Sequence, residues 1–381
     1  MAHKTTDDKD LEDLINIDGP ETRKVIPMEL GVGFGNVASP NSPLANLIAV
    51  TAPIKGSYRR STVGGALPSV MSHPRLFVLC TAICSIVAFI AIVRFGGREE
   101  KLSDFTNVNS IDDLKLSFIH HWCLDGTDDC PCEDPLSAVP SNVGAKSWQN
   151  THMMNLKLIE DYIARVPSQD IVFLGDSITE FWNGSNRANP MRAYNKVPAI
   201  FKSLFDRSSG APIDGLALGI SGDTGPNLLY RIQNGEMPNN LNPKIWMVLI
   251  GINDMKGKKC SEEAVIMSIA RIVEEIRFRK PDATVLVNAI LPSGEGRSKK
   301  LGGLWHAIKR VNKELLKFSA KHDKVRFVDM GKIFIDSDSN GNMLSSELMP
   351  DALHPNALGY QMWGESIQKE ALSILRDLEP N

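Results

Sequence analysis

One serine has the setting of a nucleophile, in the segment FLGDSITEFW at residues 173–182. Ser177 comes two residues after a short apolar run and opens a predicted helix. The free N–H groups and positive dipole at a helix N-terminus favour negative charge, so an oxyanion formed during attack by Ser177 would be stabilised there. The alternative is that Asp176 or Ser177 merely caps the helix, because both residue types are frequent N-caps.

A candidate base lies near the C-terminus, in the segment DALHPNALGY at residues 351–360. Asp351 and His354 are about one helical turn apart. An aspartate at this spacing can hold one tautomer of the imidazole while the other ring nitrogen faces Ser177. Taken alone, the pair could equally be surface decoration.

Two further segments offer hydrogen-bond donors to an oxyanion. Gly222, in LGISGDT at residues 218–224, can present a backbone N–H where a side chain would block the approach. Asn253, in IGINDM at residues 250–255, offers an amide N–H, which is a neutral donor suited to the same task. Each segment alone is better explained as an ordinary turn, because Gly, Asn and Asp are common there.

The elements that must position these residues alternate between strands and helices. Short apolar runs predict strands, and stripes of apolar side chains at helical spacing predict helices between them. Buried strands that alternate with amphipathic helices indicate a mostly parallel sheet covered on both faces. In such sheets the site gathers at the carboxyl ends of the strands, which is where three of the segments fall. The predicted strands are residues 170–175, 213–219, 244–251, 283–290 and 325–330.

The ordered set of motifs resembles the SGNH, or GDSL-type, hydrolases. The matching motifs are Gly-Asp-Ser at 175–177, Gly222, Gly-x-Asn-Asp at 251–254 and Asp351-x-x-His354. GISGDT, GIND and DALHPNALGY are most similar to the platelet-activating-factor acetylhydrolase branch and to carbohydrate acetyl esterases. One departure is Ser221, which stands where relatives often have a second glycine. The resemblance covers about residues 147–377.

The resemblance implies a flavodoxin-like three-layer α/β/α sandwich around a five-stranded parallel sheet, with no metal or organic cofactor. It also implies a triad of Ser177, Asp351 and His354. The implied oxyanion donors are the N–H groups of Ser177 and Gly222 and the amide of Asn253. Trp182, just after the nucleophile, is expected either to line the substrate pocket or to belong to the core.

The chain before this domain predicts a membrane anchor. Residues 1–72 lack a sustained hydrophobic period and are expected to form a disordered cytosolic tail. Leu76–Val93 is an apolar run of about 18 residues without a charge, the shortest length normally interpreted as a transmembrane helix. We place this helix at residues 73–95, as a signal-anchor. A slight excess of Lys and Arg before it favours a single-pass protein whose catalytic domain is in the lumen of the ER or Golgi, or extracellular.

The region between the anchor and the domain contains clustered cysteines. Residues 96–146 are expected to form a stem, and residues 147–381 the hydrolase domain. With Cys260, the cysteines at 123, 130 and 132 can form two disulfides in three possible pairings. A zinc site is the alternative, but Cys-x-Cys with one remote Cys is not the usual ligand spacing.

Composition excludes some partners. The net charge of −3 over 381 residues argues against a nucleic-acid-binding protein, which needs a basic face.

Residues 336–347 fit the pattern of a calcium loop, but an EF-hand needs a helix on each side and a strand is expected before this one. A turn is the better interpretation.

The resulting prediction is a membrane-anchored serine esterase. It would remove a small acyl group, acetyl in the first instance, from a carbohydrate or lipid ester through an acyl-enzyme. The alternatives are a lysophospholipase or thioesterase of the same fold and a catalytically silent glycan-binding domain. The sequence does not specify an oligomeric state.

Overall fold

The computed structural model describes residues 102–296 and 298–378 of the chain. Both the predicted tail, residues 1–72, and the predicted transmembrane helix, residues 73–95, lie outside these ranges. Within the described ranges, no helix combines the length and apolar character that crossing a membrane requires.

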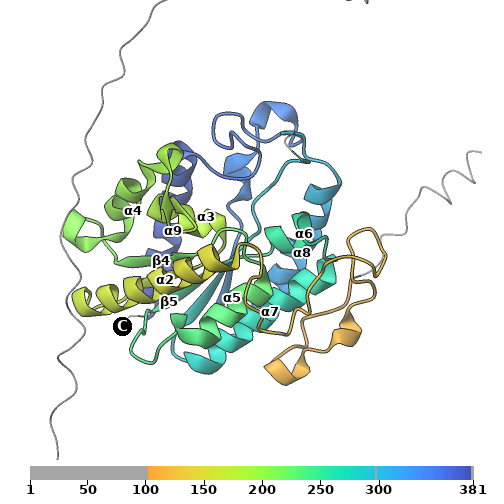
Figure 1. Ribbon diagram of the computed structural model, residues 1–381, viewed down its shortest axis with the longest axis horizontal. Coiled ribbons are helices and arrows are strands. Elements are labelled where there is room, and N and C mark those ends of the chain that lie inside the picture. Colours follow the sequence, from red (N-terminus) through yellow and green to blue (C-terminus); the bar gives the residue numbers. More distant parts are fainter. Residues whose placement is uncertain (1–101, 297, 379–381) are drawn as a thin grey trace, which may run out of the picture. The chain divides into compact units, whose positions relative to one another are not determined.

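The core of the fold is a parallel sheet of five strands in the order β4-β1-β5-β6-β7 (Figure 1). Its strands are β1 (Ile171–Gly175), β4 (Gly215–Gly219), β5 (Ile245–Leu249), β6 (Thr284–Asn288) and β7 (Val325–Val328). Numbered along the chain, this order is 2-1-3-4-5, which is the flavodoxin-like order. The first four strands are buried at every position, so they require apolar side chains on both faces. All five predicted strands are therefore confirmed, with ends that differ by at most two residues.

Helices connect the strands and cover both faces of the sheet. Because crossovers between parallel strands are right-handed, the connection that runs from β1 outward to β4 and those that run towards β7 lie on opposite faces. The first group is α4 (Val197–Phe205), against which the C-terminal helix α9 (Ala357–Leu378) packs. The second group is α5 (Gly225–Arg231), α7 (Glu262–Arg279) and α8 (Gly303–Ser319), in which α7 packs against both neighbours. The remaining long helix, α2 (Ala145–Arg165), packs against β4.

The predicted helix signals are present in α7 and α9. Ser261 caps α7 by accepting a hydrogen bond from the N–H of Ala264, and Glu262 and Glu263 occupy the first turn. The predicted apolar stripe of α9 is buried: Tyr360, Trp363, Ile367, Ala371 and Ile374.

The shorter elements lie mainly in the connections. They are η1 (Ile111–Asp113), η2 (Leu116–Phe118), α3 (Ser177–Glu180), η3 (Phe181–Asn183), β2 (Ser185–Asn186), β3 (Asn189–Pro190), η4 (Arg192–Tyr194), η5 (Arg207–Ser209), η6 (Ile232–Glu236), α6 (Ile252–Lys256), η7 (Gly331–Phe334) and η8 (Ser337–Ser339).

Residues 102–146 are not a separate stem, which corrects the predicted boundary at residue 146. Phe105, Val108, Leu114 and Ile119 are buried in the same hydrophobic core as the sheet. Burying such side chains against the domain stabilises each by about 1.5–3 kcal/mol relative to exposure, so the segment gains by packing on the domain. The residues from 96 to 101 lie outside the described part of the chain.

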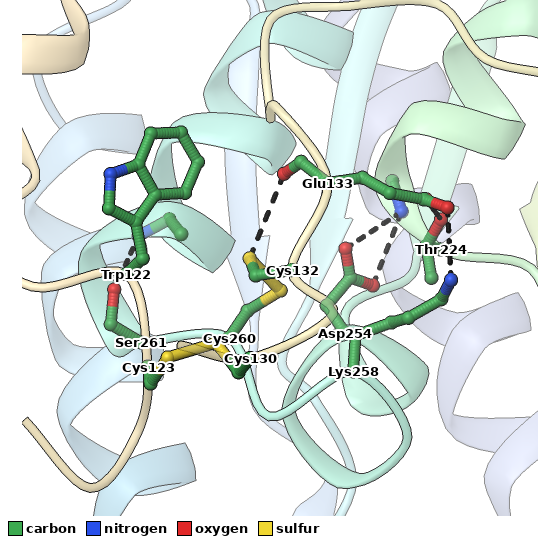
Figure 2. Close-up of a disulfide and its surroundings, with 12 residues drawn as sticks. Trp122, Cys123, Cys130, Cys132, Glu133, Thr224, Asp254, Lys258, Cys260 and Ser261 are labelled. Carbon is green, nitrogen blue, oxygen red and sulfur yellow. Dashed lines mark hydrogen bonds and ion pairs between the residues drawn. A yellow bond between two sulfur atoms is a disulfide. The ribbon is translucent and has the colours of Figure 1, made fainter. Parts of the chain in front are cut away.

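The segment contains one internal disulfide, and a second disulfide attaches it to the domain. Cys123 pairs with Cys130, and Cys132 pairs with Cys260, just before α7 (Figure 2). Beside the second disulfide, Glu133 forms an ion pair with Lys258 and accepts a hydrogen bond from the hydroxyl of Thr224. The segment is thus joined to the two loops that follow β4 and β5. The structure selects one of the three pairings that the sequence allowed.

Candidate active site

Ser177 is the first residue of α3, directly after the turn that leaves β1. The side chain of Asp176 caps this helix by accepting a hydrogen bond of 2.9 Å from the N–H of Ile178. Gly175 has no room for a side chain, because a Cβ there would lie 2.3 Å from the carbonyl oxygen of Leu249. This close approach of β1 to β5 fixes the turn. As the first helical residue, Ser177 has an N–H without an acceptor inside the helix.

A hydrogen-bonded chain joins Ser177, His354 and Asp351. Ser177 Oγ lies 2.9 Å from His354 Nε2, and His354 Nδ1 lies 2.7 Å from Asp351 Oδ2. The backbone N–H of His354 donates to the other carboxylate oxygen of Asp351 at 2.7 Å. The geometry allows the serine proton to pass to Nε2 while Asp351 holds the opposite side of the ring.

The carboxylate of Asp351 is held in its ionised form. Partial burial alone would raise its pKa, but the hydrogen bonds from the side chain and backbone of His354 outweigh burial and bring the pKa to about 2. Phe181 packs against the imidazole of His354, and the centroids of the two rings are 4.8 Å apart. The ring orientation of His354 is therefore fixed from two sides.

Gly222 occupies a turn that only glycine adopts readily, with φ of +88°. Among the residues that the structure describes, no acceptor bonds to its N–H. An N–H without a partner is available to donate to an oxyanion. The turn expected at Gly222 is therefore present, and its role as an oxyanion donor stays a prediction.

Asn253 joins the loops that follow β1, β4 and β5. Its Nδ2 donates to the carbonyl oxygen of Asp223 at 2.9 Å and to Asp176 Oδ2 at 3.3 Å. Burial raises the pKa of Asp176 to about 7, because the charged form loses its hydration. The longer of the two bonds is the weaker one, so it is the one that an oxyanion would replace.

A buried ionic network underlies these loops, and the sequence analysis did not anticipate it. Arg231 is fully buried and donates to Asp223 at 2.7 Å, to Glu236 and to the carbonyl oxygen of Gly175 at 2.7 Å. Burial raises the pKa of Asp223 to about 6, although the charge of Arg231 opposes the shift. Trp148 also donates to Asp223, at 2.6 Å. Nothing in the local pattern of α5 marks Arg231 as central, because these partners come from three separate segments: the loop after β4, η6 and β1.

Trp182 lies in the core and does not reach the site. It is 1% exposed, and its ring stacks on that of Trp363 with the centroids 5.6 Å apart. Of the two roles expected for Trp182, the core role is the observed one. The residue that reaches the imidazole of His354 is its neighbour Phe181, because the 3-10 turn after α3 directs the two side chains differently.

The described residues contain no cluster of His, Cys, Asp and Glu suited to a metal ion. In the calcium-like loop at 336–347, Asp336 caps the turn η8 and accepts a hydrogen bond from the N–H of Asp338. The expected strand, β7, and then the 3-10 turn η7 precede this loop, and an isolated bridge between Ile335 and Leu344 closes it. The pattern at 336–347 therefore forms a turn closed by backbone pairing and lacks the two helices of an EF-hand.

The domain is a doubly wound α/β fold, and a hydrogen-bonded serine, histidine and aspartate lie at the carboxyl edge of its sheet. This arrangement is typical of serine hydrolases. The model of the GDSL-like lipase/acylhydrolase family matches residues 173–362, which include all four motifs. The chain belongs to this family, as its motifs predicted, and it is a serine ester hydrolase.

Known relatives share most of their length with this chain. Platelet-activating factor acetylhydrolase IB subunit alpha2 of Rattus norvegicus is 31% identical over 235 residues, which cover 61% of this chain and 87% of that protein. The corresponding subunit alpha1 of Bos taurus is 28% identical over 233 residues, 61% of this chain and 85% of that protein. A solved structure of a GDSL-like lipase from Bacteroides thetaiotaomicron has a TM-score of 0.41 and 21% identity, over 57% of this chain and 98% of that one.

Proposed function

We propose that this protein removes a small acyl group, acetyl in the first instance, from a carbohydrate or lipid ester, with Ser177 as the nucleophile. The observation that carries the proposal is the chain of hydrogen bonds from Ser177 through His354 to Asp351, at 2.9 and 2.7 Å. A serine so placed can be deprotonated as it attacks a carbonyl carbon.

The reaction would proceed in two halves. Ser177 Oγ attacks the ester carbonyl, and its proton passes to His354 Nε2. The N–H groups of Ser177 and Gly222 and the amide of Asn253 would hold the oxyanion. As the intermediate collapses, His354 gives the proton to the leaving alcohol. Water, deprotonated by the same imidazole, then attacks the acyl-enzyme and releases the acid and free Ser177.

The acyl preference is supported by the relatives, two of which are acetylhydrolases by name. The alternative is a lysophospholipase or thioesterase of the same fold. A series of aryl esters from acetate to octanoate, with a lysophospholipid and an acyl thioester, separates these activities. We expect the highest kcat/KM on the acetate, and a maximum on octanoate, lysophospholipid or thioester would replace the proposal by the alternative.

A fluorophosphonate probe tests the nucleophile directly, because only an activated serine reacts with it. The full chain should be labelled once, on Ser177, and Ser177→Ala should lose both the label and esterase activity. Labelling of a different serine, or an active Ser177→Ala variant, would remove the proposed mechanism.

We also propose that residues 76–93 anchor the protein in a membrane, with the catalytic domain in the lumen of the ER or Golgi or outside the cell. The two disulfides support this location, because disulfides persist mainly in oxidising compartments. Protease treatment of sealed microsomes that contain the full chain tests it. The domain should be protected until detergent is added, whereas its digestion from the cytosolic face would reverse the orientation.

A further inference from the structure

Every polar atom of Ser221, the residue before Gly222, has a hydrogen-bond partner. Its backbone N–H donates to Glu180 Oε2 at 2.8 Å, and its hydroxyl donates to the same oxygen at 2.6 Å. Its carbonyl oxygen accepts a hydrogen bond of 3.1 Å from Nε of Arg187. The N–H and the carbonyl oxygen of Ser221 are thus both held by side chains, directly before the predicted oxyanion donor.

Glu180 is the centre of this arrangement. It is the last residue of α3, three positions after Ser177, and is 1% exposed. Its second oxygen accepts hydrogen bonds from the N–H of Ala188 at 2.9 Å and from the hydroxyl of Ser185 at 3.2 Å. Four donors therefore converge on one buried carboxylate. Removing any of them would leave part of a buried acceptor unpaired, which is costly, so the loop has one favoured position relative to α3.

Arg187 supports the same loop from the hairpin of β2 and β3. Arg187 and Ala188 form the tip of this hairpin with φ of +48° and +62°, a conformation that non-glycine residues rarely adopt. The guanidinium also donates to the carbonyl oxygen of Val143 at 2.6 Å. Its Nη2 lies 3.1 Å from where a Cβ of Gly222 would be. The tip is therefore held against the turn that contains Gly222.

We propose that Glu180 and Ser221 are positioning residues, which hold the N–H of Gly222 at the place where the oxyanion forms. The inference rests on the proposed function, because it assigns a task to the Gly222 donor. It also gives a physical meaning to the serine at 221. A glycine there would lack the hydroxyl that donates to Glu180, so this chain restrains the turn with a side chain. Glu180 and Ser177 lie in the same short helix, so the hydrogen bonds from Ser221 to Glu180 connect the turn of Gly222 to the helix of the nucleophile.

The test compares Glu180→Gln and Ser221→Ala with Asp170→Asn in the full chain. Gln keeps the size of Glu but turns an amide N–H₂ towards donors. We expect Glu180→Gln to lower kcat on an aryl acetate about 10²-fold with little change in KM, since misplacement of a catalytic group by about 1 Å has that effect. Ser221→Ala should lower kcat by a smaller factor. The double variant should be no slower than Glu180→Gln alone, because the two side chains act as one unit.

Asp170→Asn is the matched control. Asp170 is also a buried carboxylate that accepts a backbone N–H, from Asp214 at 2.8 Å, but it lies at the opposite, amino end of β1. This variant should melt at a lower temperature and keep its kcat. Equal kcat losses in Asp170→Asn and Glu180→Gln would mean that the effect is general destabilisation and would overturn the proposal.

The outcome also separates this inference from the proposed function. If Ser177→Ala is inactive while Ser221→Ala and folded Glu180→Gln keep full kcat, the proposed function stands and the positioning role is wrong. A loss confined to KM in the two variants would contradict it as well. If Ser177→Ala is active, the proposed function itself fails.

Discussion

The amide of Asn253 donates a hydrogen bond of 2.9 Å to the backbone carbonyl oxygen of Asp223. This bond joins the loop after β4 to the loop after β5, across β1, which lies between these strands in the sheet. The order of strands along the sheet reverses between β1 and β5, and ligands of doubly wound folds bind at such a switch point. The predicted oxyanion donors therefore flank Ser177 because of the topology of the sheet.

Replacement of Ser177 or His354 by alanine should abolish most turnover. Ser177 forms the bond to the acyl group and His354 moves the proton, so each variant should lose about 10⁶-fold in kcat on an aryl acetate. The double variant should be no worse than either single one, since the residues act as a unit. Steady-state kinetics of the three variants test this, and multiplicative losses would show that the two residues act separately.

Asp351→Asn should be less damaging, with a loss of about 10⁴-fold in kcat, because the aspartate orients the ring and does not exchange protons with substrate. With a pKa of about 2, Asp351 stays ionised throughout the neutral range. The pH–rate profile of the native chain should therefore contain no step from Asp351 between pH 4 and pH 9. A loss in Asp351→Asn as large as that in His354→Ala would contradict this division of roles.

Asn253→Ala removes one of three proposed oxyanion donors and should lower kcat about 10²–10³-fold. KM should change little, because the donor acts on charge that develops in the transition state. Comparison of kcat and KM with Asn253→Asp, which keeps the shape but replaces a donor by an acceptor, sharpens the test. An Asn253→Ala variant that raises KM and keeps kcat would instead assign Asn253 to ground-state binding.

Asp254→Asn should change how stability depends on pH. Burial raises the pKa of Asp254 to about 7 in the folded protein. At pH values between the unfolded and the folded pKa, Asp254 is therefore protonated in the folded protein and ionised in the unfolded chain. The native free energy of unfolding should thus fall as pH rises through this window. Asn can still accept the hydrogen bond from Gly225 N–H and does not ionise. Urea unfolding at pH 5 and pH 8 should show the variant gaining on the native chain at pH 8. A constant difference would mean that Asp254 is already ionised at pH 5.

The two disulfides should contribute unequally to stability. Cys132 and Cys260 are 128 residues apart in sequence, whereas Cys123 and Cys130 are 7 apart. Chain entropy therefore predicts a loss of up to about 5 kcal/mol in the free energy of unfolding for Cys132→Ser with Cys260→Ser, and about 2 kcal/mol for Cys123→Ser with Cys130→Ser. Each double replacement serves as the control for the other in denaturant unfolding. The reverse order would show that contacts around the bridges matter more than loop length.

Local sequence patterns were sufficient to predict the sheet, the helices and the principal candidate site residues. A continuous apolar run predicts a strand buried on both faces, and apolar residues at a spacing of 3.6 predict a helix. These local patterns appear in β1 and α9 without knowledge of the partner elements. Ser177 and the Asp351–His354 pair could be singled out because each motif is short and has its own chemistry. Their convergence followed from a general property of parallel sheets, whose loops gather at one edge.

Contacts between groups that are distant in the chain could not be predicted from local patterns and depend on the tertiary fold. The pairing of Cys132 with Cys260, the packing of residues 102–146 on the domain and the burial of Trp182 depend on contacts between segments far apart in the chain. The partners of Glu180 also come from separate segments, and no sequence motif distinguishes Glu180 from other polar residues. Its four donors come from the hairpin and from the loop after β4, so their meeting at one carboxylate is set by the closure of the fold and by the cost of leaving a buried charge without partners.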